Sequence, residues 1–307
     1  MQPLHIDTPL FESRPLSMQA GRSVWLKLDA LQPPGSFKIR GIGHACQEYV
    51  QRGAGRLISS SGGNAGIAVA YAGRLLSVPV LIVVPETTSE LARALIRREG
   101  AEVVVHGDSW QEANELAESR VEESDVLVHP FDDPLVWRGH STLIDEVAGS
   151  GVKPGAVVVS VGGGGLLCGL VEGMRRHGWS DVPVIAVETE GADSLAQSMR
   201  AGHRIELPAI TSLAITLGAK KVCQRAFDCT RDHPLRSIVV SDRAAVSACQ
   251  RFLADHRLVV EPAFGASLAA VYDGARELDD FETVLVVVCG GATTTLEQLA
   301  EWARASA

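Results

Sequence analysis

The chain has 307 residues, of which 46% are hydrophobic and 21% are charged. This balance excludes an intrinsically disordered chain, which combines low hydrophobicity with high net charge. The 28 basic and 37 acidic side chains leave a formal net charge of −9. Because phosphate backbones are bound by an excess of basic side chains, this charge argues against nucleic acid as the main partner.

The sequence carries no signal for a membrane or for export. No run approaches the roughly 20 apolar residues of a membrane-spanning helix. The start, MQPLHIDTPL, lacks the basic and then apolar pattern of a signal peptide. The six cysteines are scattered without a Cys-x-x-Cys pair, so neither a structural zinc site nor a disulfide framework is indicated. We expect a cytoplasmic protein with reduced thiols.

Segments rich in Val and Ile alternate along the chain with segments of helical periodicity. The expected strands are residues 24–29, 56–60, 78–84, 102–106, 125–130, 156–160, 182–188, 237–240 and 283–289. Helices are expected between them, including residues 64–76, 89–100 and 109–124. Apolar strands that alternate with helices predict an α/β fold with open, twisted, mostly parallel sheets that helices cover on both faces.

The number of strands exceeds what one sheet holds comfortably, so we expect two sheets in two domains. The compact run of strand–helix units in residues 39–137 predicts a small α/β domain. Residues 1–38 and 138–307 would then form a larger, discontinuous domain. A cleft between two such domains is a common setting for an active site.

Three glycine-rich turns each follow an expected strand, at residues 59–66, 160–169 and 288–295. The second contains four consecutive glycines, Gly162 to Gly165, directly before a helical segment. Glycines at such a position let backbone N–H groups approach a phosphate, which the start of a helix also favours. A dinucleotide fingerprint does not fit, because Leu167 stands where its third glycine is needed, and no lysine follows in the manner of a Walker motif.

Four motifs then occur in a characteristic order: GSFKIRG at 35–41, SSGGNAG at 60–66, VGGGGLLCG at 161–169 and VCGG at 288–291. In this combination the chain resembles the pyridoxal-phosphate enzymes of the tryptophan-synthase-β type, known as fold type II. Within that family it is most similar to the short L-serine/L-threonine dehydratases. The resemblance extends from TPL at 8–10 to the final helical segment.

The resemblance implies that Lys38 is the Schiff-base lysine and the base that takes the substrate's α-proton. Burial would lower the pKa of this lysine, and we expect the preceding Ser36 to cap the helix that begins there. The implied cofactor contacts are Phe37, Lys38, Asn64, Gly162, Gly163, Gly164, Gly165, Leu166 and Cys289. The implied substrate-carboxylate loop is Ser61, Gly62, Gly63, Asn64 and Ala65, at the start of a helix.

Two further assignments follow from the same resemblance. Cys289 stands where the family places a neutral partner of the pyridine nitrogen, which favours elimination over chemistry that needs a long-lived carbanion. Oxygen ligands for a structural K⁺ or similar cation would come from Glu188, Ala192, Ser194 and Leu217. By contrast, Arg138 and His140 are interpreted as packing or hinge residues.

We therefore expect a homodimeric lyase that eliminates water and ammonia from L-serine or L-threonine and yields pyruvate or 2-oxobutanoate. A β-replacement enzyme such as cysteine synthase stays open as an alternative, as does a catalytically silent binding protein of the same fold. Little racemase activity is expected, because relatives that racemise carry a serine at the position of Gly62. The preference between serine and threonine is left open, since one methyl group changes discrimination only modestly.

Overall fold

A computed structural model of the protein describes residues 2–305, which form two β-sheets. The larger sheet contains six strands in the order β1-β2-β10-β7-β8-β9. All neighbours are parallel except β1 and β2, which pair antiparallel. The strands in this order are β1 (Leu10–Glu12), β2 (Ser23–Lys27), β10 (Thr283–Val287), β7 (Ala156–Ser160), β8 (Val184–Thr189) and β9 (Leu235–Val240).

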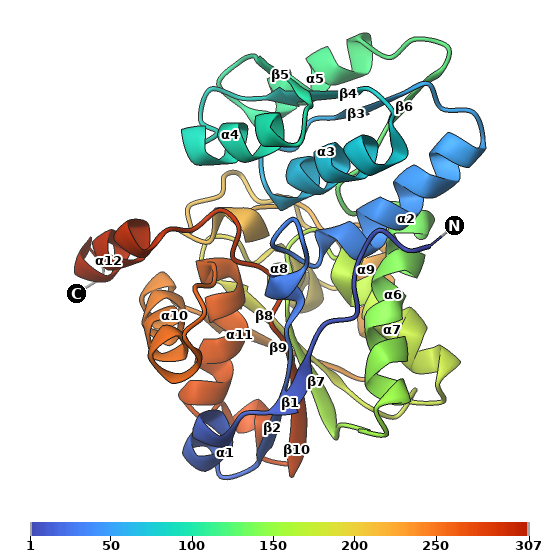
Figure 1. Cartoon of the computed structure of the whole chain (residues 1–307). Coiled ribbons are helices and arrows are strands. Elements are labelled where there is room, and N and C mark those ends of the chain that lie inside the picture. Colours follow the sequence, from blue (N-terminus) through green and yellow to red (C-terminus); the bar gives the residue numbers. More distant parts are fainter. Residues whose placement is uncertain (1, 306–307) are drawn as a thin grey trace.

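The smaller sheet has four strands in the order β5-β4-β3-β6, and all of them are parallel. Its strands are β5 (Glu102–Val105), β4 (Val80–Val84), β3 (Arg56–Ser59) and β6 (Asp125–Leu127). Figure 1 shows this sheet at the top of the molecule, with α3 and α4 on the side that faces the larger sheet and α5 on the far side.

Helices surround both sheets (Figure 1). They are α1 (Arg14–Ala20), α2 (Lys38–Gln51), α3 (Asn64–Leu76), α4 (Glu90–Arg98), α5 (Trp110–Ser119), α6 (Pro134–Gly149), α7 (Gly165–Arg176), α8 (Ser194–Ala201), α9 (Gln224–Asp232), α10 (Asp242–His256), α11 (Pro262–Tyr272) and α12 (Leu296–Ala305). Short 3₁₀ turns are η1 (Asp29–Leu31), η2 (Ile215–Leu217) and η3 (Arg276–Leu278). In the described part of the chain, no helix is long and apolar enough to cross a membrane.

The predicted fold class is confirmed, because both sheets are mostly parallel and carry helices on their faces. The burial of β7 shows the physical reason. All five residues of its sequence AVVVS are buried, as expected for a central parallel strand that is covered on both sides. The sequence patterns missed only the short edge strand β1, whose three residues are too few to show a periodicity.

The proposed domain division keeps the strands of the two sheets apart but cuts through two helices, α2 after its first residue and α6 in its first turn. The strands of the smaller sheet lie within residues 56–127, inside the proposed domain 39–137. Helix α2 starts at Lys38, at the first boundary, whereas α6 spans the second boundary at 137–138. Helix α6 packs against both α2 and α7 and so joins the two parts. The division into residues 1–38 with 138–307 and residues 39–137 remains our proposal.

Candidate active site

Lys38 is the first residue of α2 and is placed by the third glycine-rich turn. The N–H of Phe37 donates to the carbonyl of Cys289 at 2.8 Å, and Ser36 forms an isolated antiparallel bridge with Gly290. The expectation that Ser36 caps α2 is wrong, because Phe37 is the N-cap residue and makes no side-chain cap. The bridge holds Ser36 in the extended segment before the helix, and its buried hydroxyl has no hydrogen-bond partner among the described residues.

The Lys38 amine lies in surroundings that make it a better nucleophile than an ordinary lysine. Its Nζ donates to the carbonyl of Pro130 at 2.7 Å and lies 5.3 Å from the ring centroid of Phe37. Burial lowers the pKa of Lys38 to about 8, although the nearby Cys289 opposes this shift. Since the neutral form of an amine attacks a carbonyl, the site keeps a reactive fraction near neutral pH.

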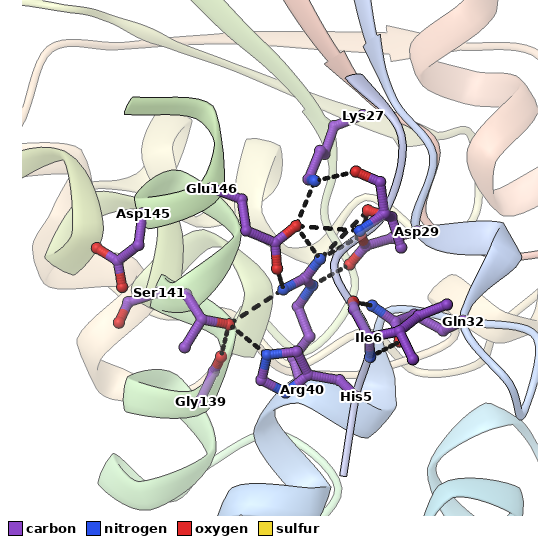
Figure 2. Close-up of polar contacts among 12 residues, drawn as sticks. His5, Ile6, Lys27, Asp29, Gln32, Arg40, Gly139, Ser141, Asp145 and Glu146 are labelled. Carbon is purple, nitrogen blue, oxygen red and sulfur yellow. Dashed lines mark hydrogen bonds and ion pairs between the residues drawn. The ribbon is translucent and has the colours of Figure 1, made fainter. Parts of the chain in front are cut away.

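A buried ion network fixes the start of α2 two residues beyond Lys38 (Figure 2). The guanidinium of Arg40 bonds Asp29 through Nε at 2.6 Å and through Nη2 at 2.9 Å. The same guanidinium bonds Glu146 of α6, which also accepts from Lys27 of β2. Arg40, Lys27 and Asp29 are almost completely inaccessible to solvent. The network therefore ties α2 to β2, η1 and α6, and it balances two positive charges with two negative ones.

The tetraglycine turn joins β7 to α7 and leaves a row of backbone donors free. Within residues 2–305, the N–H groups of Gly162, Gly163, Gly164, Gly165 and Leu166 have no hydrogen-bond acceptor. These groups lie at the start of α7, where the helix dipole favours negative charge. A row of N–H donors at the start of a helix is suited to bind an anion such as a phosphate group.

Close packing also explains why glycines occupy this turn. Gly164 has φ +94°, and a Cβ there would lie 2.3 Å from the Cβ of Ala226. A Cβ on Gly163 would lie 2.4 Å from the ring of Phe131, and one on Gly165 would lie 2.7 Å from the Phe131 carbonyl oxygen. The sequence analysis attributed the repeated glycines to a phosphate alone. The structure adds that larger residues would displace the segment around Phe131.

Asn64 begins α3 and reaches from the smaller sheet toward the larger one. Its Nδ2 donates to both carboxylate oxygens of Glu261 at 3.0 Å, whereas its buried Oδ1 has no partner within the described chain. The loop before it turns tightly, since a Cβ on Gly66 would lie 1.9 Å from the carbonyl oxygen of Ser61. Ser61, Gly62 and Gly63 remain partly exposed, and the start of α3 suits a carboxylate.

Cys289 lies just beyond the end of β10, beside the segment that leads into Lys38. Its side chain is 7% exposed. Burial and the charge of Glu261 raise the pKa of this thiol, so it stays protonated and uncharged. The structure thus gives the thiol the neutral character that the sequence analysis expected of it.

The residues suggested as cation ligands lie in two places, around the start of α8 and in η2 beside the tetraglycine turn. Both carboxylate oxygens of Glu188 accept backbone N–H groups, from Leu195 at 2.8 Å and from Ala196 at 2.7 Å. Burial raises the pKa of Glu188 to about 8. The backbone of Leu217 borders Gly162, and the buried hydroxyl of Ser194 has no partner in the described chain. The cation assignment to Glu188, Ala192, Ser194 and Leu217 therefore remains a proposal.

Three residues at the site were not singled out from the sequence. Pro130 accepts from Lys38, Phe131 packs on the tetraglycine turn, and the buried Glu261 holds Asn64. The only local signal for Glu261 is an acidic residue before the proline that starts a helix in an apolar segment. His140, interpreted as a packing residue, is fully buried with its ring centroid 4.9 Å from that of Phe37.

These features fit a pyridoxal-phosphate cofactor. Lys38 supplies an amine of lowered pKa, and the start of α7 supplies unpaired N–H groups for a phosphate. Cys289 directly precedes Gly290, and a Cβ built on Gly290 would lie 3.4 Å from Asn64 Nδ2, so both residues lie near the segment that positions Lys38 and would be available to the cofactor ring. A family model described as pyridoxal-phosphate dependent enzyme matches residues 1–290.

The chain belongs to this family. It is 47% identical to the human protein named L-serine dehydratase/L-threonine deaminase, over 97% of this chain and 94% of that one. It is 49% identical to the mouse protein named serine dehydratase-like, over 98% of this chain and 94% of that one. The expected cofactor and the expected kind of enzyme are confirmed by this membership and agree with these names.

The fold is also shared with an experimentally solved member of this enzyme family. The crystal structure of a fungal L-serine ammonia-lyase from Rhizomucor miehei superimposes with a TM-score of 0.95. The two chains are 34% identical, and the match covers 100% of both. This likeness extends over both sheets and over every segment that contributes to the site. Within residues 2–305, no group of three or more His, Cys, Asp or Glu side chains is placed to hold a metal ion.

Proposed function

We propose that this enzyme is an L-serine/L-threonine ammonia-lyase. One observation carries the proposal: an amine with a pKa of about 8, at Lys38, lies in the same site as a row of unpaired backbone N–H groups at Gly162 to Leu166. An amine that forms a covalent bond to a carbonyl and a cradle for a phosphate are the two features that bind pyridoxal phosphate. The names of the relatives support serine and threonine as substrates.

Each part of the site then has a task. Pyridoxal phosphate supplies the electron withdrawal that makes the substrate's α-proton acidic. Lys38 would anchor the cofactor through its amine, and its Nζ would take the proton from Cα of the substrate. The N–H groups at the start of α3 hold the substrate carboxylate, with Ser61 beside them. The reaction as a whole converts L-serine to pyruvate and ammonia, or L-threonine to 2-oxobutanoate and ammonia.

Cys289 favours elimination within this scheme. A thiol that stays neutral would not hold the pyridine nitrogen protonated, as an anionic partner would, so the ring would withdraw electrons less strongly. Weaker electron withdrawal would suit a reaction in which a leaving group at Cβ departs as soon as the Cα proton is removed. We assign the cation ligands to Glu188, Ala192, Ser194 and Leu217, and we propose a homodimer in the cytoplasm.

The proposal is tested with purified enzyme supplied with pyridoxal phosphate. We expect a yellow protein, and reduction with borohydride followed by peptide mass spectrometry should place the pyridoxyl group on Lys38. L-serine and L-threonine should each yield the keto acid and ammonia without an added nucleophile. A protein that stays colourless with the cofactor, or one that forms product from L-serine only when sulfide is present, would contradict the assignment as an ammonia-lyase.

A further inference from the structure

Glu261 is a buried carboxylate that the activity described above does not use. It directly precedes α11 and is 3% exposed. Although it is the N-cap residue, its side chain makes no bond to its own helix. No lysine, arginine or histidine in residues 2–305 forms an ion pair with it. An unpaired buried charge is costly, so its hydrogen bonds must compensate for the lost water.

All side-chain bonds of Glu261 go to other segments that border the site. Asn64 Nδ2 at the start of α3 donates to both oxygens at 3.0 Å. Thr216 of η2 donates through its hydroxyl to Oε2 at 2.8 Å. The backbone N–H of Thr293, in the turn after β10, donates to Oε1 at 3.3 Å. One carboxylate thus joins three segments that are remote in sequence.

The bond to Asn64 decides which way its amide points. A carboxylate only accepts hydrogen bonds, so Nδ2 must face Glu261 and Oδ1 must face away. The opposite orientation would place two acceptors against each other. Oδ1 is consequently buried without a donor among the described residues. Without Glu261, nothing in these contacts would favour one amide orientation over the other.

The pair also lies against the strand end that positions Lys38. A Cβ built on Gly290 would lie 3.4 Å from Asn64 Nδ2, 3.5 Å from Glu261 Oε1 and 3.2 Å from the Cβ of Ser36. Gly290 directly follows Cys289, and its bridge partner Ser36 leads into Lys38. A shift of Glu261 and Asn64 would therefore displace the backbone at Gly290 and Ser36, and with it Cys289 and Lys38.

We propose that Glu261 is a positioning residue, which orients the Asn64 amide and ties the start of α3 to the turn after β10. The inference rests on the proposed function where it takes Asn64 as a cofactor contact. The tie between α3 and Glu261 is a property of the protein alone and can be measured without cofactor.

The first test is hydrogen exchange in the cofactor-free protein, followed by mass spectrometry. Glu261→Gln keeps the volume but removes one acceptor and the charge, so amides 61–66 should exchange at least about fivefold faster than in the parent. Asp255→Asn is the matched control. Asp255 accepts a bond from the hydroxyl of Tyr272, at the opposite end of α11, and its loss should leave amides 61–66 unchanged. Unchanged exchange of these amides in Glu261→Gln overturns the proposal.

The second test is the dissociation constant of pyridoxal phosphate, measured by fluorescence. Glu261→Gln should weaken binding about tenfold, as expected for a lost hydrogen bond to a charged group. If Glu261 acts through Asn64, the double variant with Asn64→Ala should bind no more weakly than Asn64→Ala alone. Losses that multiply in the double variant would overturn this route. Should Glu261→Gln not fold, Glu261→Asp is used in the same two tests, with the same directions expected, because its shorter side chain cannot reach all three donors.

The two experiments separate the failure of one proposal from the failure of the other. If the parent binds the cofactor and Asn64→Ala binds it equally well, Asn64 is not a cofactor contact and that part of the proposed site is wrong. Faster exchange of amides 61–66 in Glu261→Gln would still support the positioning role in that case. If the parent binds no cofactor at all, the proposed function fails, whereas the exchange experiment remains decisive for Glu261.

Discussion

Arg40, which follows Lys38 by two residues, forms an ion pair with Asp29 in which both side chains are inaccessible to solvent. Burial alone would lower the pKa of Arg40, but Asp29 and Glu146 together raise it, so the guanidinium stays charged. Because α2 begins at Lys38, a guanidinium held from two sides also limits how far the reactive amine can move (Figure 2). The proposed Schiff-base lysine is therefore supported by a charged pair that is buried in the protein.

Asp29→Asn should destabilise the protein by about 3–5 kcal/mol, because it leaves the buried positive charge of Arg40 partly unpaired. Chemical denaturation of the cofactor-free protein measures this loss. The control is Asp279→Asn, which removes the partly exposed pair with Arg22 and should change stability by less than about 1 kcal/mol. Equal effects of the two variants would show that burial of the network contributes nothing.

Covalent attachment of pyridoxal phosphate should follow the protonation of Lys38. With a pKa of about 8, the amine is neutral in about a tenth of molecules at pH 7, compared with less than about a thousandth for an ordinary lysine. The attachment rate, followed by absorbance, should rise with pH and level off above about pH 8. A rate that still rises steeply through pH 10 would mean that burial does not lower the pKa of this amine.

Gly164→Ala should impair cofactor binding more than strain alone explains. Gly164 and Gly178 both have positive φ, +94° and +70°. A Cβ on Gly164 would lie 2.3 Å from Ala226, whereas a Cβ on Gly178 would meet nothing within 4 Å. We expect Gly178→Ala to lose about 1–2 kcal/mol of stability and to keep its cofactor affinity. Gly164→Ala should lose more stability and bind pyridoxal phosphate at least about tenfold more weakly, by titration of the cofactor-free protein.

Gly62→Ser alone should not introduce racemase activity, because Thr88 occupies the space. A Cβ on Gly62 would lie 2.4 Å from Thr88 Oγ1 and 2.6 Å from its Cγ2. The single variant should lose about 1–3 kcal/mol of stability through overpacking. Gly62→Ser with Thr88→Ala should recover that stability, and only this double variant should form D-serine from L-serine, measured by chiral chromatography. Formation of D-serine by the single variant would show that Thr88 moves aside.

Local patterns were enough to predict the fold class and to single out residues that the structure brings together in the candidate site. The Val- and Ile-rich strands predicted parallel sheets, because a strand covered on both faces must be apolar on both faces. Lys38, the tetraglycine turn and Cys289 lie in short motifs, and each motif is formed by residues that are neighbours in sequence. The tetraglycine turn offers its own backbone N–H groups, and Lys38 and Cys289 offer their own side chains, so the sequence shows these groups directly.

The helix cap at Ser36 was predicted wrongly for a related reason. A serine just before a helical segment is a common cap, and the local pattern favoured a helix that begins next to Ser36. The pairing of Ser36 with Gly290 joins residues that are far apart in the chain and holds the serine outside the first turn. A long-range contact thus overruled a local preference.

The sequence by itself determined the two-sheet architecture and pointed to Lys38 and the tetraglycine turn as candidates for the cofactor site. Only the tertiary structure decided what holds them: Glu261 against Asn64 across 197 residues, and Arg40 against Asp29 and Glu146 across 11 and 106 residues. Thr88 against Gly62 belongs to the same group. These contacts depend on how separate segments meet in the fold. The residues next to a buried carboxylate or threonine in the sequence do not indicate which distant residue it contacts. The chemistry is local in sequence, whereas its positioning is a property of the assembled fold.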